Sequence, residues 1–451
     1  MTCNSTSSAN GRCLFRCDEI AALFDGVVRL DGMIDHDATP GVLDHCQITG
    51  SSDLHLIIDL GHQPPCNALL TPETLNQPEV TYPLRLVHCP ASGLAQLDYV
   101  VEASAVYPPD YPYRSGISAP LVEYQGELAG DVARKSGAAA GAFCVDIGSN
   151  DGTLLAHFAR MGFRVLGVEP TNIADFARSH TGVETIQSFF TAKLAREIAR
   201  DYGRAQVVTM TNVFAHMASL GEVMRGVGDL LDTHGVFVTE SHYLLDVLEK
   251  NQFDTIYHEH IRTYSLKALV TLFSYYGLEV FDVDRGARYA GNIRAYVARA
   301  GTRTISSSVG ELLRLEDAVG LHEPRTWEGF RARVYEQRDR FMEFAYRSHR
   351  SGRRLVGYSC PGRATPLLNF YGMTPDVLPY IAELPDSLKL GKFVPGAHIP
   401  IVPTERLLSE PGDYVAVFAW HYADAIRERL RREGVSALPL TPLPEFVAPD
   451  Q

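Results

Sequence analysis

Between residues 143 and 241 the sequence alternates apolar segments with amphipathic ones, and this order constrains the fold more than any other feature. The apolar segments "FCVDIG", "RVLGVEP", "QVVTMTNVF" and "GVFVTES" have the length of buried strands. The segments between them, "TLLAHFARMG", "TAKLAREIARDYG" and "LGEVMRGVGDLL", have helical spacing. Strands that alternate with helices form a parallel sheet covered by crossover helices. The sequence therefore predicts an α/β domain at the centre of the chain.

Composition divides the rest of the chain into flanking parts. Residues 1–40 are expected to be an N-terminal extension, and residues 41–125 carry short apolar alternations that indicate a small strand-rich module. The central α/β domain is expected over 126–300, followed by a helical connector over 301–350. Strand, turn and helix signals over 351–451 predict a second α/β domain.

Charge and hydropathy exclude two classes of partner from the expected function. The 451 residues carry a formal charge of −13 without a block rich in Lys and Arg, which argues against nucleic-acid binding. No run of 18 or more apolar residues is present, and the N-terminus lacks the pattern of a secretory signal. We therefore expect a cytoplasmic protein that acts on a small molecule, without a membrane or nucleic-acid partner.

A glycine-rich turn follows the first predicted strand of the central domain. The segment "FCVDIGSNDGTLL" places Asp146 at the strand end and then passes through Gly148, Ser149, Asn150 and Gly152 before a helix begins. Glycines in such a turn let the backbone approach a ligand closely at the carboxyl edge of a sheet. The spacing matches neither the dinucleotide pattern G-x-G-x-x-G nor a P-loop, so we expect no phosphate cradle.

An acidic residue ends the second predicted strand. Glu169 stands where a carboxylate can accept hydrogen bonds from both ribose hydroxyls of a nucleoside. A nucleoside without phosphates suits this acid and the acidic turn before it, and S-adenosylmethionine is such a ligand. We therefore predict S-adenosylmethionine as the cofactor, with Asn212 after the next long strand also beside it. The alternative is that the glycine turn is purely structural.

Proton-handling side chains gather in the short segment "FDTIYHEHIRTYS". It contains Tyr257, Glu259 and His260, and the strand order brings it close to Asn212 and His216 of "TNVFAHM". Each residue alone has a structural explanation, because a lone histidine is more often a satisfied polar group. Their convergence on one sheet edge favours acid–base chemistry.

Six motifs resemble the deoxysugar C-methyltransferases: "DIGSNDGTLL", "GVEPTNIA", "NVFAHM", "FDTIYHEHIRTYSL", "LLNFYGM" and "VPGAHIPI". The similarity runs from about residue 44 to about residue 435, nearly the whole chain. That family methylates a carbon next to the ketone of a nucleotide-activated 4-keto-6-deoxy sugar. The resemblance implies a Rossmann-like (class I) methyltransferase domain between an N-terminal zinc module and a C-terminal α/β domain that helps to hold the sugar nucleotide. It also implies a thymidine-diphosphate sugar as acceptor and a role in antibiotic or other deoxysugar biosynthesis.

The resemblance also assigns roles to the proton-handling residues. It makes His260 the general base, assisted by Tyr257 and Glu259, with His216 and Asn212 near the enolate or sugar oxygens. A base is needed because a carbon next to a carbonyl becomes nucleophilic once its proton is removed, and the oxyanion that forms needs hydrogen-bond donors. No metal is expected to take part in this step.

Four further residues are expected to bind the acceptor. Tyr111 and Tyr113 in "YPPDYPYRSGIS" resemble a segment that reaches over the family's active site, although a Pro-rich turn with packed aromatic rings is the alternative. Arg294 of "RYAGNIR" and Arg363 of "GYSCPGRATP" lie in segments that depart from the family's usual residues. Arg363 stands where lysine is common, and a guanidinium can face a phosphate.

The family's zinc module uses two Cys-x-x-Cys pairs, because four thiolates close a tetrahedral structural site. Here the two pairs read Cys46-x-x-Thr49 and Cys89-x-x-Ser92, so each has a hydroxyl in place of its second thiol. Because a hydroxyl is a poor zinc ligand, we expect no metal and a module that folds around its apolar core. The alternative is a site completed by a nearby histidine: His45, His62 or His88.

Three functions remain open from the sequence. The leading one is C-methylation of a nucleotide-linked keto-deoxysugar, and the second is the same chemistry on a ketone that is not a sugar nucleotide. The third is a non-catalytic scaffold that binds S-adenosylmethionine. The presence of His216, Tyr257, Glu259 and His260 argues against the third.

Overall fold

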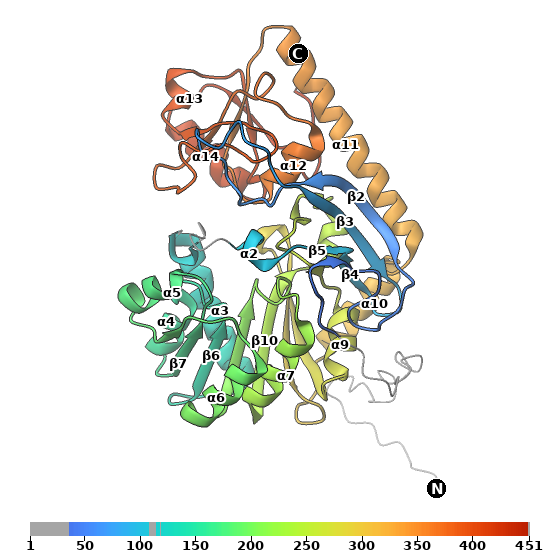
Figure 1. Cartoon of the computed structure of the whole chain (residues 1–451), viewed down its shortest axis with the longest axis vertical. Coiled ribbons are helices and arrows are strands. Elements are labelled where there is room, and N and C mark those ends of the chain that lie inside the picture. The colour runs from blue at the N-terminus through green and yellow to red at the C-terminus, as the bar shows by residue number, and fades with distance from the viewer. Residues whose placement is uncertain (1–35, 108–113, 118, 450–451) are drawn as a thin grey trace, which may run out of the picture.

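The computed structural model describes residues 36–107, 114–117 and 119–449. Tyr111, Tyr113 and most of the predicted N-terminal extension therefore lie outside the described residues. The described chain forms three sheet-containing parts, with the central sheet at one end of the molecule, the C-terminal sheet at the other, and the N-terminal strands beside the junction (Figure 1).

The described residues of the central domain form a seven-stranded sheet in the order β12-β13-β10-β9-β6-β7-β8. Within it β13 pairs antiparallel with both neighbours, while the β10, β9, β6, β7 and β8 pairs are parallel. The strands are β6 (Phe143–Ile147), β7 (Arg164–Val168), β8 (Thr185–Ile186), β9 (Ala205–Thr211), β10 (Leu231–His242), β12 (Leu278–Gly286) and β13 (Asn292–Arg299). All five residues of β6 are buried, as expected for a strand covered by helices on both faces.

Helices cover the two faces of this sheet and connect its strands. They are α3 (Ala119–Ser136), α4 (Thr153–Arg160), α5 (Ile173–Phe176), α6 (Ala192–Tyr202), α7 (Leu220–Leu230), α8 (Leu244–Glu249) and α9 (Leu266–Ser274). The strands and helices follow the alternation expected from the sequence, so the predicted Rossmann-like α/β fold is confirmed. The expected domain boundary at residue 125 falls inside α3.

The N-terminal module is an antiparallel sheet in which one edge strand comes from the central domain. Its order is β11-β4-β3-β2, and a separate two-stranded ladder joins β1 to β5. The bounds are β1 (Gly41–Val42), β2 (His55–Gln63), β3 (Tyr82–Cys89), β4 (Leu94–Leu97), β5 (Tyr99–Val100) and β11 (Arg262–Thr263), with the short helix α2 (Ala103–Val106) after β5. Because β11 directly follows Tyr257–His260, the module fixes one end of that segment.

The C-terminal domain is a second parallel α/β unit, as the sequence predicted. Its strands lie in the order β16-β15-β14-β17-β18, and every adjacent pair is parallel. The strands are β14 (Leu355–Tyr358), β15 (Ile381–Glu383), β16 (Ile401–Pro403), β17 (Tyr414–Val417) and β18 (Leu438–Leu440). The helices are α12 (Ala364–Tyr371), α13 (Arg406–Ser409) and α14 (Ala423–Arg432).

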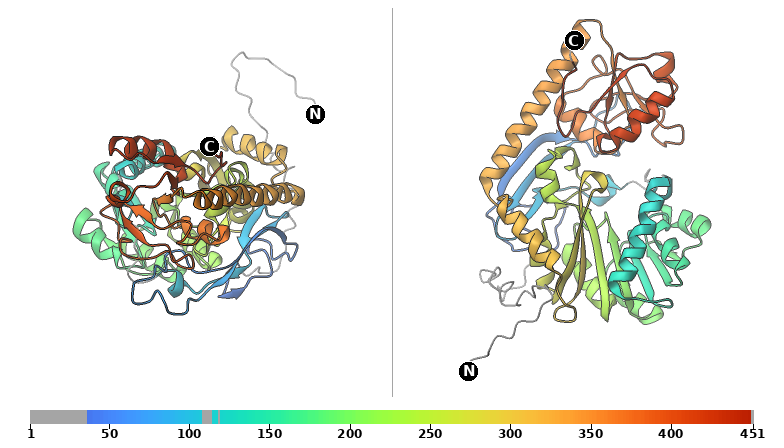
Figure 2. Two further views of the ribbon diagram at one scale, coloured as in Figure 1. Left: turned by 90° about the horizontal axis from the view of Figure 1, so that it is seen from above. Right: turned by 180° about the vertical axis from the view of Figure 1, so that it is seen from behind.

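Two helices connect the central and C-terminal domains where the sequence predicted one polar helical stretch. They are α10 (Ser307–Ala318) and α11 (Pro324–Arg350). The chain breaks between them because Gly320 takes a φ of 64° and a proline begins the next helix. The 27-residue helix α11 runs along the side of the molecule (Figures 1 and 2), and Arg331 donates to the carbonyl oxygens of Leu56 and Ile57 in the N-terminal module. Helix α11 therefore braces all three parts.

The last residues of the predicted extension pack on the folded parts. His36 is buried, and its Nε2 lies 3.1 Å from the carbonyl oxygen of Ile48. Asp37 accepts a hydrogen bond from the backbone N–H of Glu222 in α7.

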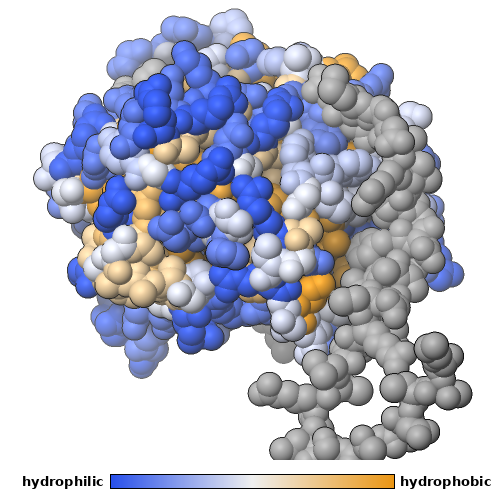
Figure 3. All heavy atoms as spheres, turned by 90° about the horizontal axis from the view of Figure 1, so that it is seen from below, coloured by the Kyte–Doolittle hydropathy of each residue, from blue (hydrophilic) through white to orange (hydrophobic). Residues whose placement is uncertain are grey.

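Hydrophilic side chains cover much of the face shown in Figure 3, with apolar patches between them. Within the described ranges, no helix is both long enough and apolar enough to cross a membrane.

Candidate active site

A cavity of about 740 Å³ lies at the carboxyl ends of β6, β7, β9 and β10. Ligands of open α/β sheets bind at this edge. The walls of the cavity come from all three parts of the chain, with Asn67 and Tyr107 from the N-terminal module and Lys389 and His421 from the C-terminal domain. A ligand in the cavity is therefore enclosed between the central domain and its two neighbours.

The glycine turn after β6 forms one wall of this cavity. Gly148, Ser149 and Asn150 line it. Gly148 has a φ of 73°, and a Cβ added there would lie 2.5 Å from Cγ2 of Val213, so both the backbone conformation and the space require glycine. Gly152 instead marks the start of α4 and is not among the cavity-lining residues.

Asp146 lies at the end of β6 beneath the turn. Its side chain is buried, lines the cavity, and accepts a hydrogen bond of 2.6 Å from the Thr209 hydroxyl. Burial raises the pKa of Asp146 to about 7; the Thr209 hydrogen bond opposes this rise, and the charge of Glu169 adds to it. A cation bound in the cavity would therefore favour loss of the proton from this carboxyl group.

Glu169 and Asn212 border the same wall. Glu169 accepts hydrogen bonds from the backbone N–H groups of Asn150 and Thr171, both at 3.0 Å, so it joins the loops that follow β6 and β7. Asn212 has a φ of 56° and donates its backbone N–H to the carbonyl oxygen of Glu240 at 2.7 Å. Both side chains line the cavity, so the structure brings together the expected cofactor-side residues apart from Gly152.

His260 is held in one tautomer by the backbone. Its Nδ1 lies 2.6 Å from the carbonyl oxygen of Thr255, and because a carbonyl only accepts, Nδ1 must carry the proton. Burial lowers the pKa of His260 to about 4, so the ring is neutral near pH 7. Nε2 then presents a lone pair, and it has no hydrogen-bond partner among the described residues. His260 therefore has the protonation state that a general base requires.

Aromatic and imidazole rings surround His260. The ring centroid of Tyr257 lies 4.0 Å away, and those of His216 and His242 lie 4.9 and 5.0 Å away. Burial lowers the pKa of His216 and raises that of Tyr257, and the charge of Glu259 raises the Tyr257 pKa further. A neutral histidine and a protonated tyrosine therefore flank His260.

Glu259 is fixed by the N-terminal module. Its Oε1 accepts hydrogen bonds from Nδ2 of Asn67 at 2.5 Å and from the Cys66 thiol at 3.2 Å. The side chain is buried, and it lines the cavity together with Asn67. The strand-rich module therefore helps to position the segment that contains Glu259 and His260.

The C-terminal domain anchors the same segment through an ion pair. Asp254 is fully buried, and both of its oxygens accept from Arg363 at 2.7 Å. The indole N–H of Trp420 donates to the same carboxylate at 2.9 Å. On the other side, Arg262 donates to Oε1 of Gln47 at 2.8 Å. The segment from Asp254 to Arg262 is thus tied to both flanking parts.

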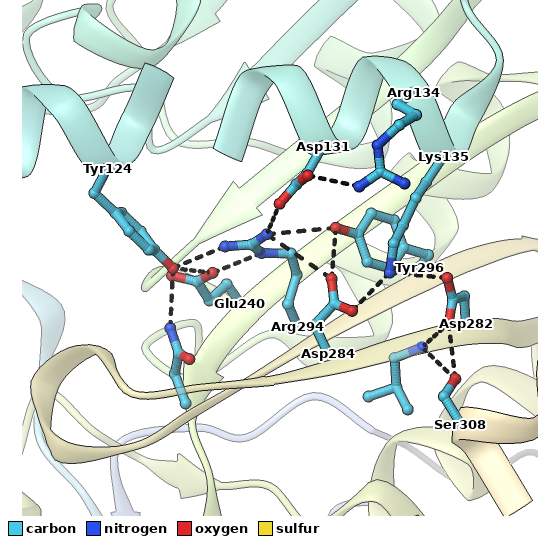
Figure 4. A network of polar contacts seen from close by, with 12 residues as sticks. Tyr124, Asp131, Arg134, Lys135, Glu240, Asp282, Asp284, Arg294, Tyr296 and Ser308 are labelled. Carbon is cyan, nitrogen blue, oxygen red and sulfur yellow. Dashed lines mark hydrogen bonds and ion pairs between the residues drawn. The ribbon is translucent and has the colours of Figure 1, made fainter. Parts of the chain in front are cut away.

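The two arginines expected to bind the acceptor have different places. Arg363 lines the cavity, but Asp254 balances its charge. Arg294 is not among the cavity-lining residues; it donates to Glu240 and Tyr124, both at 2.8 Å, in the network of Figure 4. Arg294 therefore positions two side chains of the cavity wall instead of reaching the cavity itself.

Glu240 was expected at this sheet edge, as the end of the strand "GVFVTES", and it lines the cavity. Four cavity residues were not expected from the sequence: His242, Arg288, Lys389 and His421. His242 has a signal that could have found it, because it lies two residues after Glu240 on one strand and so points to the same face. The other three come from loops or short 3-10 turns near Arg363, where no local pattern marks a site.

The four positions of the zinc-type motifs lie together but form a poor metal site. The Cys46 sulfur lies 3.2 Å from the Ser92 hydroxyl oxygen, and the Thr49 hydroxyl oxygen lies 3.7 Å from the Cys89 sulfur. Burial and the neighbouring Cys89 raise the pKa of the Cys46 thiol. Among the described residues no three His, Cys, Asp or Glu side chains gather in a way that could hold a metal ion. Two thiols and two hydroxyls therefore do not fit a structural zinc site.

Three family models match successive parts of the chain. Residues 46–107 match "Putative zinc binding domain", residues 123–283 match "Methyltransferase domain", and residues 288–438 match "C-methyltransferase C-terminal domain". Together they cover most of the chain in the order of its three parts.

The chain is also similar, to different extents, to individual proteins. C-methyltransferase NovU from Streptomyces niveus is 32% identical over 412 residues, which cover 90% of this chain and 97% of NovU. Ubiquinone biosynthesis O-methyltransferase from Azorhizobium caulinodans is 30% identical over 99 residues, or 22% of this chain and 39% of that protein. Magnesium protoporphyrin IX methyltransferase from Synechocystis, solved with bound SAH, matches 40% of this chain and 83% of its own at 14% identity and a TM-score of 0.31.

The buried ion pair gives a first prediction. Replacing Asp254 by Asn leaves the buried guanidinium of Arg363 without its anion, so the free energy of unfolding should fall by about 3 kcal/mol or more. Chemical denaturation measures this change. As a control, Asp424→Asn removes an exposed carboxylate that pairs with Arg427 on α14 and should change stability by less than about 0.5 kcal/mol. Equal stability of Asp254→Asn and the unaltered protein would show that the pair does not anchor the segment.

Proposed function

The chain belongs to the family of S-adenosylmethionine-dependent C-methyltransferases, and from that premise we propose that its acceptor is a nucleotide-activated keto-deoxysugar, methylated at a carbon next to the ketone. The observation that carries the proposal is His260, a buried neutral imidazole whose Nε2 is left free for a proton by the Nδ1 bond to Thr255. Methylation of a carbon next to a ketone requires such a base, because that carbon becomes nucleophilic only once its proton is removed.

Cationic groups in the cavity lining support an anionic acceptor. Arg288 and Lys389 line the cavity beside Arg363, whose charge Asp254 balances. Burial lowers the pKa of His421 to about 2, so that ring is a neutral hydrogen-bonding group. Nζ of Lys389 donates to the carbonyl oxygen of Cys360 at 2.7 Å, which leaves two of its three N–H donors for a ligand. A diphosphate beside these groups would leave the attached sugar facing His260. Tyr111 and Tyr113 remain expected contacts, and Arg294 would act through Glu240 and Tyr124.

Different residues of the cavity wall would bind the cofactor and the acceptor. Glu169 would accept hydrogen bonds from the ribose hydroxyls of the cofactor, and the turn at Gly148 with Asp146 and Asn212 would hold the rest of it. S-adenosylmethionine, when bound, supplies an electrophilic methyl group. Enclosure between three parts of the chain excludes water, which strengthens hydrogen bonds to a developing charge.

His260 and its neighbours handle the proton and the oxyanion. Nε2 of His260 takes the proton from the carbon next to the ketone, and the electron pair of that C–H bond moves to form the enolate. His216 and the Tyr257 hydroxyl lie beside this position as donors to the oxyanion. Glu259, held by Asn67 and Cys66, fixes the backbone between Tyr257 and His260. The enolate carbon is then the nucleophile for the methyl group that S-adenosylmethionine would supply.

Methyl transfer tests this proposal. The protein is incubated with S-adenosylmethionine labelled in its methyl group and a panel of thymidine-diphosphate 4-keto-6-deoxy sugars. We expect label in the sugar of at least one panel member, and His260→Asn should lower turnover by about 10³-fold because the base is lost. The affinity for S-adenosylmethionine should change little, since His260 lies on the acceptor side. As a control, His234→Asn alters an exposed histidine of β10 and should leave turnover unchanged.

Two outcomes would contradict the proposal. Transfer to a simple ketone but to no sugar nucleotide would assign the same chemistry to a different acceptor. A protein that binds S-adenosylmethionine but transfers no methyl to any acceptor would be the scaffold considered above.

The raised pKa of Asp146 predicts a pH-dependent cofactor affinity. In the free protein Asp146 holds a proton below about pH 7, and a cationic ligand beside it favours the ionised form, so binding must release that proton. The dissociation constant of S-adenosylmethionine should therefore rise by up to about fivefold as the pH falls from 7 to 6, because the ionised fraction of Asp146 falls from about one half to about one tenth. Calorimetric titrations at both values measure it, and Asp146→Asn should remove most of the dependence. An equal pH slope in that variant would place the titrating group elsewhere.

We also propose that the N-terminal module holds no zinc and that a hydrogen-bonded thiol–hydroxyl cluster takes the place of the metal. Protein produced with added zinc should contain far less than one zinc per chain by elemental analysis. The double variant Thr49→Cys, Ser92→Cys restores two Cys-x-x-Cys pairs and should bind about one zinc per chain. Near-stoichiometric zinc in the unaltered protein would overturn this proposal.

A further inference from the structure

His242 ends β10 at the edge of the cavity. It pairs with Asn292 of β13, and it lies two residues beyond Glu240 on the same strand. Because side chains alternate along a strand, Glu240 and His242 point to the same face, and both line the cavity. Hydrogen bonds from Tyr124 and Arg294 hold the Glu240 carboxylate in the network of Figure 4.

Neither ring nitrogen of His242 has a hydrogen-bond partner among the described residues. Nδ1 is fully buried, whereas Nε2 keeps some solvent-accessible surface. A buried N–H without an acceptor is rare and costly, so the favoured tautomer carries its proton on Nε2. Burial lowers the pKa of His242, and the neighbouring His260 and Arg363 lower it further, so the ring is neutral. His242 therefore presents one N–H donor to the cavity.

The surroundings of His242 place this donor next to the base. Its ring centroid lies 5.0 Å from that of His260 and 6.0 Å from that of Tyr289. His216 lies on His260 as well, with centroids 4.9 Å apart. An acceptor whose proton reaches Nε2 of His260 is therefore within reach of the His242 ring.

Hydrogen bonds hold a strained turn in place beside His242. Tyr289 and Ala290 have φ values of 53° and 68°, which non-glycine residues adopt rarely. Lys250 and Gln252 donate to the carbonyl oxygen of Ala290 at 2.6 and 2.9 Å and hold the turn. Strain that is retained by such bonds is typical of ligand-binding walls. The turn keeps the Tyr289 ring against His242.

We propose that His242 is an acceptor-binding residue whose Nε2–H donates a hydrogen bond to the oxygen that becomes negatively charged when His260 removes the proton. This inference rests on the proposed function, because it assumes that the acceptor is an enolisable ketone. It adds a donor on the β10 side of His260 to the donors Tyr257 and His216.

The competing role for His242 is packing alone, and three substitutions separate the two roles. His242→Phe keeps a flat ring against His260 and Tyr289 but removes both nitrogens. His242→Gln places an amide N–H near the position of Nε2, and His242→Asn places one near the position of Nδ1. A donor role from Nε2 therefore predicts the activity order Gln, then Asn, then Phe, whereas packing favours Phe.

The experiment measures kcat and KM for the sugar-nucleotide panel member that the unaltered protein methylates best, together with the affinity for S-adenosylmethionine. We expect kcat/KM to fall at least 100-fold in His242→Phe, the loss typical of a missing oxyanion donor, and about tenfold or less in His242→Gln. Cofactor affinity should stay within threefold in every variant, which also reports that each variant is folded.

A matched control is available in His88, which is fully buried, has an unpartnered Nδ1, and is absent from the cavity lining. His88→Phe should leave kcat/KM within threefold. Full activity of His242→Phe, or more activity in it than in His242→Gln, would overturn the inference while leaving the proposed function intact. If the unaltered protein methylates no panel member, the proposed function fails and the assignment of His242 fails with it.

Discussion

The buried ion pair between Asp254 and Arg363 sets the position of the segment that carries His260, the proposed base. Asp254 has no exposed surface, and its two oxygens take both guanidinium bonds at 2.7 Å. Removing two charges from water costs free energy that only close, complete pairing offsets, so this contact tolerates little movement. Six residues later His260 lies between this anchor and β11, which belongs to the N-terminal sheet. The position of His260 therefore depends on contacts with all three parts of the chain.

Enclosure between those parts explains the electrostatics of the cavity. Burial keeps His216, His242 and His260 neutral, so imidazoles can act as base or donors near pH 7. The same burial raises the pKa of Asp146 on the cofactor side. A cation and an anionic acceptor would each change this balance on binding. Burial of these side chains thus prepares one wall for a cationic cofactor and another for the proposed proton transfer.

Sequence patterns predicted the central sheet well because its strands are short apolar runs, as in β6, that need burial on both faces. They also brought together Asp146, Glu169 and His260, since the ends of parallel strands share one edge. They did not show that Arg294 lies in a network behind the wall, because the pairing of β10 with β13 depends on tertiary structure. Residues such as Lys389 reach the cavity through loops and domain docking, which leave no periodic signal.

Solvent exchange at the acceptor carbon tests most directly whether His260 is the base. The protein is mixed in deuterated buffer with a thymidine-diphosphate 4-keto-6-deoxy sugar and S-adenosylhomocysteine, which allows deprotonation without methyl transfer, and the proton signal next to the ketone is followed by NMR. We predict that the unaltered protein removes this signal and that His260→Asn, still able to bind the cofactor product, does not. Equal exchange by both proteins would contradict the account, because the proton would then be leaving to another group.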